Sequence, residues 1–80
     1  MVTPELVKQY IEAGLVCTYL TVDGDGAHFD AVIVSPLFSG KRLIERHRLV
    51  NQALSGRLGD EIHALSMKTL SPEEWAEQQG

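Results

Sequence analysis

Residues 16–35, VCTYLTVDGDGAHFDAVIVS, decide the fold because they contain two strand-like runs joined by a tight turn. Val16–Val22 is rich in Val, Thr, Tyr and Leu, which are residue types enriched in strands. The glycines of Asp23-Gly24-Asp25-Gly26 accept the positive φ that short hairpin turns require. Ala27–Ser35 is the return strand, and its Val-Ile-Val run indicates an interior strand covered at least partly on both faces. The sequence therefore predicts an antiparallel hairpin that ends at Pro36.

Helical patterns lie on both sides of this hairpin. Thr3 as N-cap and Pro4 at the first position predict a helix over residues 3–13, with Gly14 as its C-terminal stop. After the Ser39-Gly40 turn, the main helix is expected to run from Lys41 to about Leu54. One apolar stripe of that helix is expected to face the core, and it contains Leu43, Ile44, His47, Val50 and Leu54.

The C-terminal part predicts one more strand and one more helix. Residues 62–69 have a strand pattern, and Ser71-Pro72-Glu73-Glu74 is a capping box that opens a short helix, with Trp75 packing onto the body. The connection of about 26 residues from strand 2 to strand 3 allows a right-handed crossover, which makes those strands parallel. We therefore expect a single α+β domain over residues 1–80 with the order α-β-β-α-β-α. Its three-stranded mixed sheet should carry the first two helices on one face.

Composition and charge exclude several classes of protein. Eighty residues, 44% of them hydrophobic, supply one small core and no second domain. No apolar run approaches the roughly 18 residues that span a bilayer, and no secretory signal is visible. The single cysteine, Cys17, can form neither an internal disulfide nor a thiolate cluster site. These features predict a cytoplasmic protein with no membrane association.

The basic residues are unevenly distributed. The formal charge of −4 argues against general nucleic-acid binding, which depends on neutralising phosphates. Four of the seven Lys and Arg residues nevertheless fall in one eight-residue stretch: Lys41, Arg42, Arg46 and Arg48. This stretch predicts a local basic face for a partner or a nucleic acid, with Arg46 and Arg48 pointing toward solvent.

Catalytic chemistry has little support. No nucleophile can be placed beside a base, and the chain is too short for a deep cleft, so we expect a non-enzymatic protein. Gly56-Arg57-Leu58-Gly59 is a literal GxxG, as in the backbone clamp of KH domains, but it lacks room for the helix that follows in KH domains. A fraying helix end is the favoured interpretation. His47 is expected to face the core and to be satisfied by a hydrogen bond.

His28 and His63 are the candidate metal ligands. Each stands at the start of a predicted strand, and the two strands are predicted to be parallel, which puts both residues at one end of the sheet. In-register neighbours would lie about 5 Å apart, within range of one metal centre. Two imidazoles are an incomplete site, so a partner would supply the remaining ligands; on one iron of a [2Fe–2S] cluster they would be Rieske-like. Two unrelated surface histidines are the alternative.

Taken together, several motifs resemble the BolA-like family, in particular its short, IbaG-like bacterial branch. The likeness covers essentially the whole chain, and the spacing of F-x-G, R-H-R-x-V and I-H-A-L is specific. The residues that carry it are Gly24–Phe29, Phe38-Ser39-Gly40, Arg46–Leu54, Ile62–Thr69 and Ser71–Trp75.

The resemblance implies a class II KH-like fold and a partner. Members of this family pair with monothiol (CGFS) glutaredoxins, and the pair holds a [2Fe–2S] cluster ligated by the glutaredoxin cysteine, glutathione and the BolA-like protein. The family's C-terminal histidine ligand maps onto His63. Its second ligand comes from a loop that carries cysteine or histidine, and His28 is the candidate here. The resemblance implies no cluster on the isolated chain.

Three functions follow as hypotheses. The first is a glutaredoxin-paired iron–sulfur accessory protein with roles in iron homeostasis and stress response. The second is a KH-like, DNA-binding transcriptional regulator that uses the basic face of the main helix, as described for some family members. The third is an interaction module without metal chemistry. Whether the free chain is a monomer or a homodimer stays open.

Overall fold

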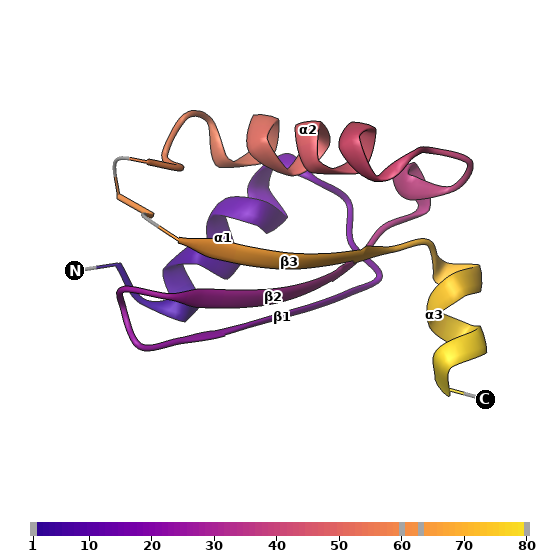
Figure 1. Ribbon diagram of the computed structural model, residues 1–80, viewed down its shortest axis with the longest axis horizontal. Coiled ribbons are helices and arrows are strands. Elements are labelled where there is room, and N and C mark those ends of the chain that lie inside the picture. The colour runs from indigo at the N-terminus through magenta and orange to yellow at the C-terminus, as the bar shows by residue number, and fades with distance from the viewer. Residues whose placement is uncertain (1, 60, 63, 80) are drawn as a thin grey trace.

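The computed structural model describes residues 2–59, 61–62 and 64–79, and its elements follow the expected order α-β-β-α-β-α (Figure 1). One short 3-10 helix, η1, is added between the second strand and the second helix. The elements are α1 (Pro4–Gly14), β1 (Tyr19–Gly24), β2 (Phe29–Val34), η1 (Pro36–Phe38), α2 (Leu43–Leu54), β3 (Leu65–Leu70) and α3 (Pro72–Gln79).

The three strands form one mixed sheet in the order β1-β2-β3. β1 and β2 are antiparallel, with Tyr19 opposite Val34. β2 and β3 are parallel, with Phe29 opposite Leu65. Both predicted strand directions are therefore confirmed, and β2 is the interior strand.

The core lies between one face of this sheet and the helices α1 and α2 (Figure 1). Alternate residues of β2 point into it because side chains of a strand alternate between the two faces. The fully buried side chains at its centre are Val7 and Ile11 of α1, Phe29 and Ile33 of β2, and Val50 and Leu54 of α2. Among the described residues, no helix is both long enough and apolar enough to cross a membrane.

The opposite face of the sheet is covered only at one end, by α3. Trp75 of α3 stacks on Tyr19 of β1, with ring centroids 4.6 Å apart, which confirms its predicted packing onto the body. Val34 and Leu70 are buried at this end, whereas Asp30 at the other end of β2 is exposed. The central strand is therefore partly covered on both faces, as predicted.

Gly14 has a different role from the one predicted. It is the last residue of α1 and does not adopt a positive φ, so it is not a left-handed stop. A Cβ atom at this position would lie 2.7 Å from the Cα of Ala53 in α2. Glycine is required here because the two helices approach each other closely.

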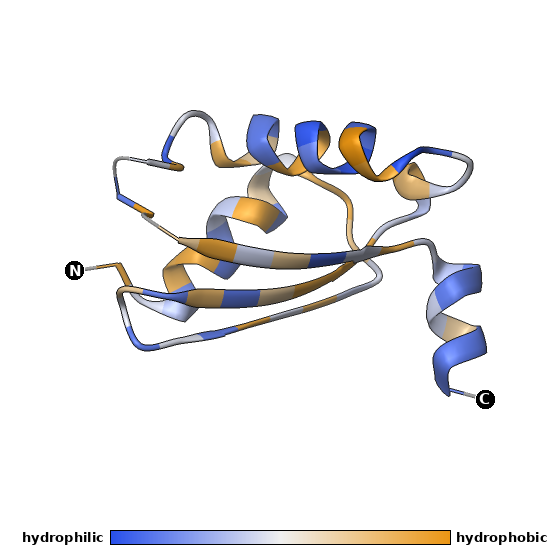
Figure 2. Ribbon diagram, in the orientation of Figure 1, coloured by the Kyte–Doolittle hydropathy of each residue, from blue (hydrophilic) through white to orange (hydrophobic). Residues whose placement is uncertain are grey.

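The apolar stripe of α2 was predicted incorrectly in its first turn. Leu43 is 61% exposed and Ile44 is 55% exposed, whereas Val50, Ala53 and Leu54 are buried. The first turn carries hydrophobic residues (Figure 2), but the residues that α2 buries all lie in its middle and last turns. Helical periodicity shows that Leu43 is in phase with Val50 and Leu54, but it does not show where along the helix the contact with the core begins.

Several element boundaries also differ from the prediction. The strands begin later, at Tyr19 and Leu65, and α2 begins at Leu43. Ile62 does not start β3 because its N–H bonds to the carbonyl oxygen of Arg57 at 3.1 Å, within the turn that closes the α2–β3 connection.

Candidate functional site

His28 lies in the β1–β2 turn, directly before the first residue of β2, and hydrogen bonds within the turn hold its backbone. The Asp25 carboxylate accepts hydrogen bonds from the N–H groups of Ala27 and His28 at 3.0 and 2.9 Å. The N–H of Asp25 donates in return to the His28 carbonyl oxygen at 3.1 Å. The hydrogen bonds from His28 and Ala27 also lower the pKa of Asp25. Asp25 is therefore a turn former, as predicted, and it presents the exposed His28 from a rigid hairpin.

The segment that precedes β3 lies beside the start of β2. The N–H of Phe29 donates to the carbonyl oxygen of Ala64 at 2.9 Å, and Phe29 pairs with Leu65. Ala64 and Leu65 therefore lie beside Phe29, the residue that follows His28. His63 itself lies outside the described residues, and the predicted sharing of one metal stays a prediction.

No complete metal site forms from the part of the chain that the structure describes. Within residues 2–59, 61–62 and 64–79, no three His, Cys, Asp or Glu side chains are grouped closely enough to hold a metal ion.

His47 differs from its predicted environment. It is half-buried in α2, and its Nε2 atom is buried without a hydrogen-bond partner among the described residues. The expectation that a hydrogen bond satisfies this histidine is therefore wrong for Nε2. The hydroxyl of Thr69, on β3, is likewise buried without a partner.

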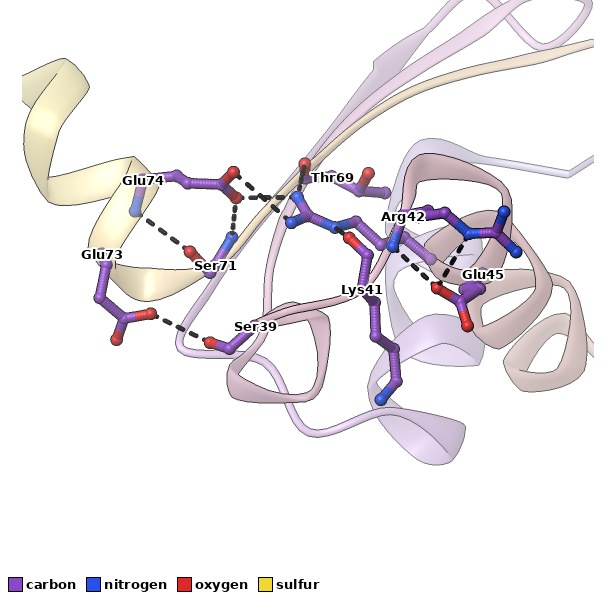
Figure 3. A network of polar contacts seen from close by, with 9 residues as sticks. Ser39, Lys41, Arg42, Glu45, Thr69, Ser71, Glu73 and Glu74 are labelled. Carbon is purple, nitrogen blue, oxygen red and sulfur yellow. Dashed lines mark hydrogen bonds and ion pairs between the residues drawn. The ribbon is translucent and has the colours of Figure 1, made fainter.

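Arg46 was expected to point toward solvent, and the structure shows the opposite. Its side chain is only 11% exposed, and its guanidinium forms an ion pair with Glu74 of α3 at 2.8 Å. The same group donates to the carbonyl oxygens of Thr69 and Lys41 and lies over the ring of Phe38. Arg46 therefore joins α2, η1, β3 and α3, and Figure 3 shows the polar contacts of this network around Lys41, Thr69, Ser71 and Glu74.

This network also lowers the pKa of the Glu74 carboxyl group. The hydrogen bond from Arg46 is the largest cause that lowers the pKa of Glu74 from 4.5 to about 2. The N–H of Ser71 also donates to Glu74, and the N–H of Glu74 donates to the Ser71 hydroxyl, which confirms the predicted capping box of α3. Arg46 is thus a structural residue, and local helical periodicity could not reveal partners 23 and 28 residues away.

The other three basic residues of the stretch, Lys41, Arg42 and Arg48, are exposed. Lys41 and Arg42 lie beyond the C-terminal end of β2, whereas His28 precedes its N-terminal end (Figure 1). A six-residue strand spans about 17–20 Å. Lys41 and Arg42 therefore lie at the opposite end of β2 from His28.

The GxxG segment forms a defined turn, so the interpretation as a fraying helix end is wrong. Ser55 caps α2 in the left-handed conformation, and Gly56 and Gly59 have φ of 79° and 96°. Arg57 donates to the Leu54 carbonyl oxygen at 3.1 Å, and its guanidinium lies 3.9 Å from the ring centroid of Tyr10. This contact between α1 and the α2–β3 connection carries no local sequence signal.

Sequence comparison matches the chain to one family of proteins. The family model described as BolA-like protein matches residues 11–74. Protein BOLA2 of Arabidopsis thaliana is 44% identical over 94% of this chain and 85% of its own length. The DNA-binding transcriptional regulator BolA of Vibrio cholerae is also 44% identical, over 90% of this chain but only 65% of its own length.

Solved structures agree with these sequence relatives. A bolA protein homologue from Coxiella burnetii superposes with a TM-score of 0.82 at 44% identity, covering 95% of this chain and 99% of that one. A bol-like protein from Babesia bovis gives a TM-score of 0.83 at 39% identity, over 100% and 96% of the two chains. The predicted fold class is confirmed. On its sequence motifs, its topology and these matches, the chain belongs to the BolA-like protein family.

Proposed function

We propose that this chain is a non-enzymatic accessory protein that pairs with a monothiol glutaredoxin and helps to hold or transfer a [2Fe–2S] cluster. Membership of the BolA-like family supports the proposal. The structural observation that carries it is the adjacency of two chain segments, because the residues that follow His28 and His63 are hydrogen-bonded across the start of the parallel ladder. His28 would be one ligand and His63 the other.

The chemistry of the donors fits such a cluster. His28 is exposed, and the hydrogen bonds of the Asp25 turn engage its backbone and leave the imidazole available. Imidazole nitrogen is an established ligand of [2Fe–2S] iron, where it raises the reduction potential relative to thiolate. When bound, the cluster would supply electron-transfer or cluster-donation chemistry. The chain's own part would be to present the His28 imidazole from the hairpin, to add the His63 imidazole as the second ligand, and to leave the remaining positions to sulfur ligands of the partner.

Visible circular dichroism tests this proposal directly. The chain is mixed with a monothiol glutaredoxin, glutathione, ferrous iron and sulfide, and the spectrum is compared with that of the glutaredoxin alone. We expect the wild-type chain to change the cluster spectrum, and His63→Ala and His28→Ala each to remove or alter that change.

Asp30→Asn is the matched control because Asp30 lies two residues from His28, is exposed and sits on the open face of the sheet. It should give the wild-type spectrum. If His63→Ala also gave the wild-type cluster spectrum, the ligand assignment would be wrong.

DNA binding is the second candidate, and it is favoured by the similarity to the DNA-binding transcriptional regulator BolA of Vibrio cholerae. Within the basic stretch the accessible cations would be Lys41, Arg42 and Arg48, because Arg46 is paired with Glu74. A gel shift at physiological salt tests it. Specific binding should be lost in Lys41→Glu/Arg48→Glu, and no shift below about 10 µM protein would exclude the idea.

A further inference from the structure

Exposed aliphatic residues occur on both sides of the junction of η1 and α2, and they are not part of the core. Leu43 and Ile44 occupy consecutive positions in the first turn of α2 and are 61% and 55% exposed. Leu37 of η1, in the connection that leads into α2, is 46% exposed. With the flanking Lys41 and Arg42, these residues form what we call the η1–α2 corner. Figure 2 shows the hydrophilic residues that lead into α2 followed by hydrophobic residues in its first turn.

The backbone of this corner is held in place independently of its exposed side chains. The N–H of Arg42 donates to the Glu45 carboxylate at 2.8 Å, and the N–H of Lys41 donates to the Phe38 carbonyl oxygen at 3.1 Å. Arg46 donates to the Lys41 carbonyl oxygen at 2.9 Å. The residues that α2 buries, Val50, Ala53 and Leu54, lie in its later turns. The exposed aliphatic groups of the first turn are therefore held on an ordered backbone and are not part of the core.

The charge of the corner is opposite to that of the chain. Lys41 and Arg42 are exposed on a molecule with a formal charge of −4. Within the described residues Lys41 forms no ion pair, and Arg42 meets only Glu45, at 3.6 Å. Adjacent aliphatic and cationic side chains complement a surface in which apolar residues are flanked by carboxylates.

A nucleic acid complements this corner less well than a protein does. Aliphatic side chains contribute little to binding phosphates, which depends on the number of cations. The Ser39 hydroxyl donates to Glu73 at 3.0 Å, so a carboxylate of α3 is held beside the loop that precedes Lys41. The negative charge of Glu73 weakens the attraction between this surface and a nucleic acid. It has less effect on a protein partner whose main contacts are with Leu43 and Ile44.

We infer that the η1–α2 corner docks an acidic, amphipathic helix of a partner protein, with Leu43 and Ile44 as the apolar contacts and Lys41 and Arg42 as the charged rim. The corner lies beyond the opposite end of β2 from His28 (Figure 1). It can therefore be occupied without contact to the histidine end. The inference goes beyond the proposed function and does not depend on a cluster.

A peptide titration followed by methyl NMR tests this inference without iron or glutaredoxin, so its failure is distinguishable from failure of the proposed function. The probe is a helical peptide of about 15 residues with leucine on one face and glutamate on its flanks. We expect the methyl signals of Leu37, Leu43 and Ile44 to shift together, with a dissociation constant on the order of 100 µM or tighter. A peptide with lysine in place of glutamate should bind about 10-fold more weakly.

Substitutions then locate the contact. Leu43→Ser/Ile44→Ser should weaken binding about 10-fold while leaving thermal unfolding unchanged, because neither side chain is in the core. Leu58→Ser is the matched control, since Leu58 is 38% exposed in the connection beyond the other end of α2. Equal binding of the two peptides, or equal binding by wild type and Leu43→Ser/Ile44→Ser, would overturn the inference. So would tighter binding of a short DNA duplex to the same methyl groups.

Discussion

Single side chains at the ends of the sheet determine what this molecule can present to a partner. Asp25 uses its carboxylate to fix the backbone of His28, and Arg46 uses its guanidinium to join four elements. The sequence pattern assigns Asp25 to a turn, as the structure confirms, but it assigns Arg46 to a binding face. Their hydrogen bonds show that both hold the chain in the shape from which other residues can act.

The Glu74 carboxylate makes the docking of α3 dependent on pH. Its pKa is about 2 in the folded protein, compared with an ordinary value of 4.5, because Arg46 and Ser71 bind the ionised form. A depressed carboxyl pKa contributes stability above the unfolded pKa, and that contribution is lost as the pH falls through the folded value. We expect the fluorescence of Trp75, the single tryptophan, to report loosening of α3 between about pH 4.5 and pH 2.

Glu74→Gln provides the control for this transition. It keeps the size of the side chain and removes the titrating group, so the Trp75 signal should lose most of its dependence on pH in this window. An unchanged acid transition in Glu74→Gln would show that another group drives the loosening.

The buried Nε2 atom of His47 is expected to lower the free energy of unfolding. This atom is buried without a hydrogen-bond partner among the described residues, and an unmade hydrogen bond of that kind is unfavourable by about 1–3 kcal/mol. His47→Leu, with a side chain of similar size, should therefore raise the free energy of unfolding by about 1 kcal/mol. Urea denaturation with an unchanged m-value measures this. A loss of stability in His47→Leu would show that the imidazole has a partner in solution, such as a buried water.

At the scale of elements, the contact between α1 and α2 depends on Gly14. Gly→Ala inside a helix normally stabilises it by about 0.5–1 kcal/mol. Here the new Cβ would meet the Cα of Ala53 at 2.7 Å, so Gly14→Ala should instead destabilise the protein by about 1–3 kcal/mol. Thermal or urea unfolding shows whether the substitution raises or lowers the free energy of unfolding. Ala13→Gly, at an exposed position one residue earlier, is the control and should cost only the intrinsic helix propensity.

The elements that sequence could predict are those with local signals. The Thr3 cap and the Ser71–Glu74 capping box are determined within a few residues, and each forms as predicted. The hairpin also forms, but its turn begins at Asp25, because Asp23 and Gly24 belong to β1 and Gly26 alone of the two glycines has a positive φ. The burial of Arg46 depends on contacts with Thr69 and Glu74, which are distant in the sequence. The exposure of the first turn of α2 has no local sequence signal either, because Leu43 is in helical phase with the buried Val50 and Leu54. The pairing of Phe29 with Leu65 is also a contact between residues distant in the sequence, so its prediction depends on the parallel arrangement of β2 and β3.

At the scale of the whole molecule, the candidate sites occupy opposite ends of an elongated domain. The principal extents are 36 × 23 × 19 Å, and the longest axis runs along the sheet, from the hairpin at one end to η1 and α3 at the other (Figure 1). β2 separates His28 from the η1–α2 corner by about 17–20 Å. Partners at the two ends would therefore contact different residues.

This separation predicts that the two ends act independently. Sites with no shared partners and more than about 10 Å apart usually show additive free energies. We expect His28→Ala to leave the affinity for the acidic peptide unchanged, and Leu43→Ser/Ile44→Ser to leave the visible circular dichroism of the glutaredoxin-bound cluster unchanged. The double-mutant cycle between these two changes should give a coupling free energy below about 0.5 kcal/mol in either assay. A larger coupling would mean that one partner spans both ends of the sheet, or that β2 transmits a change in conformation between them.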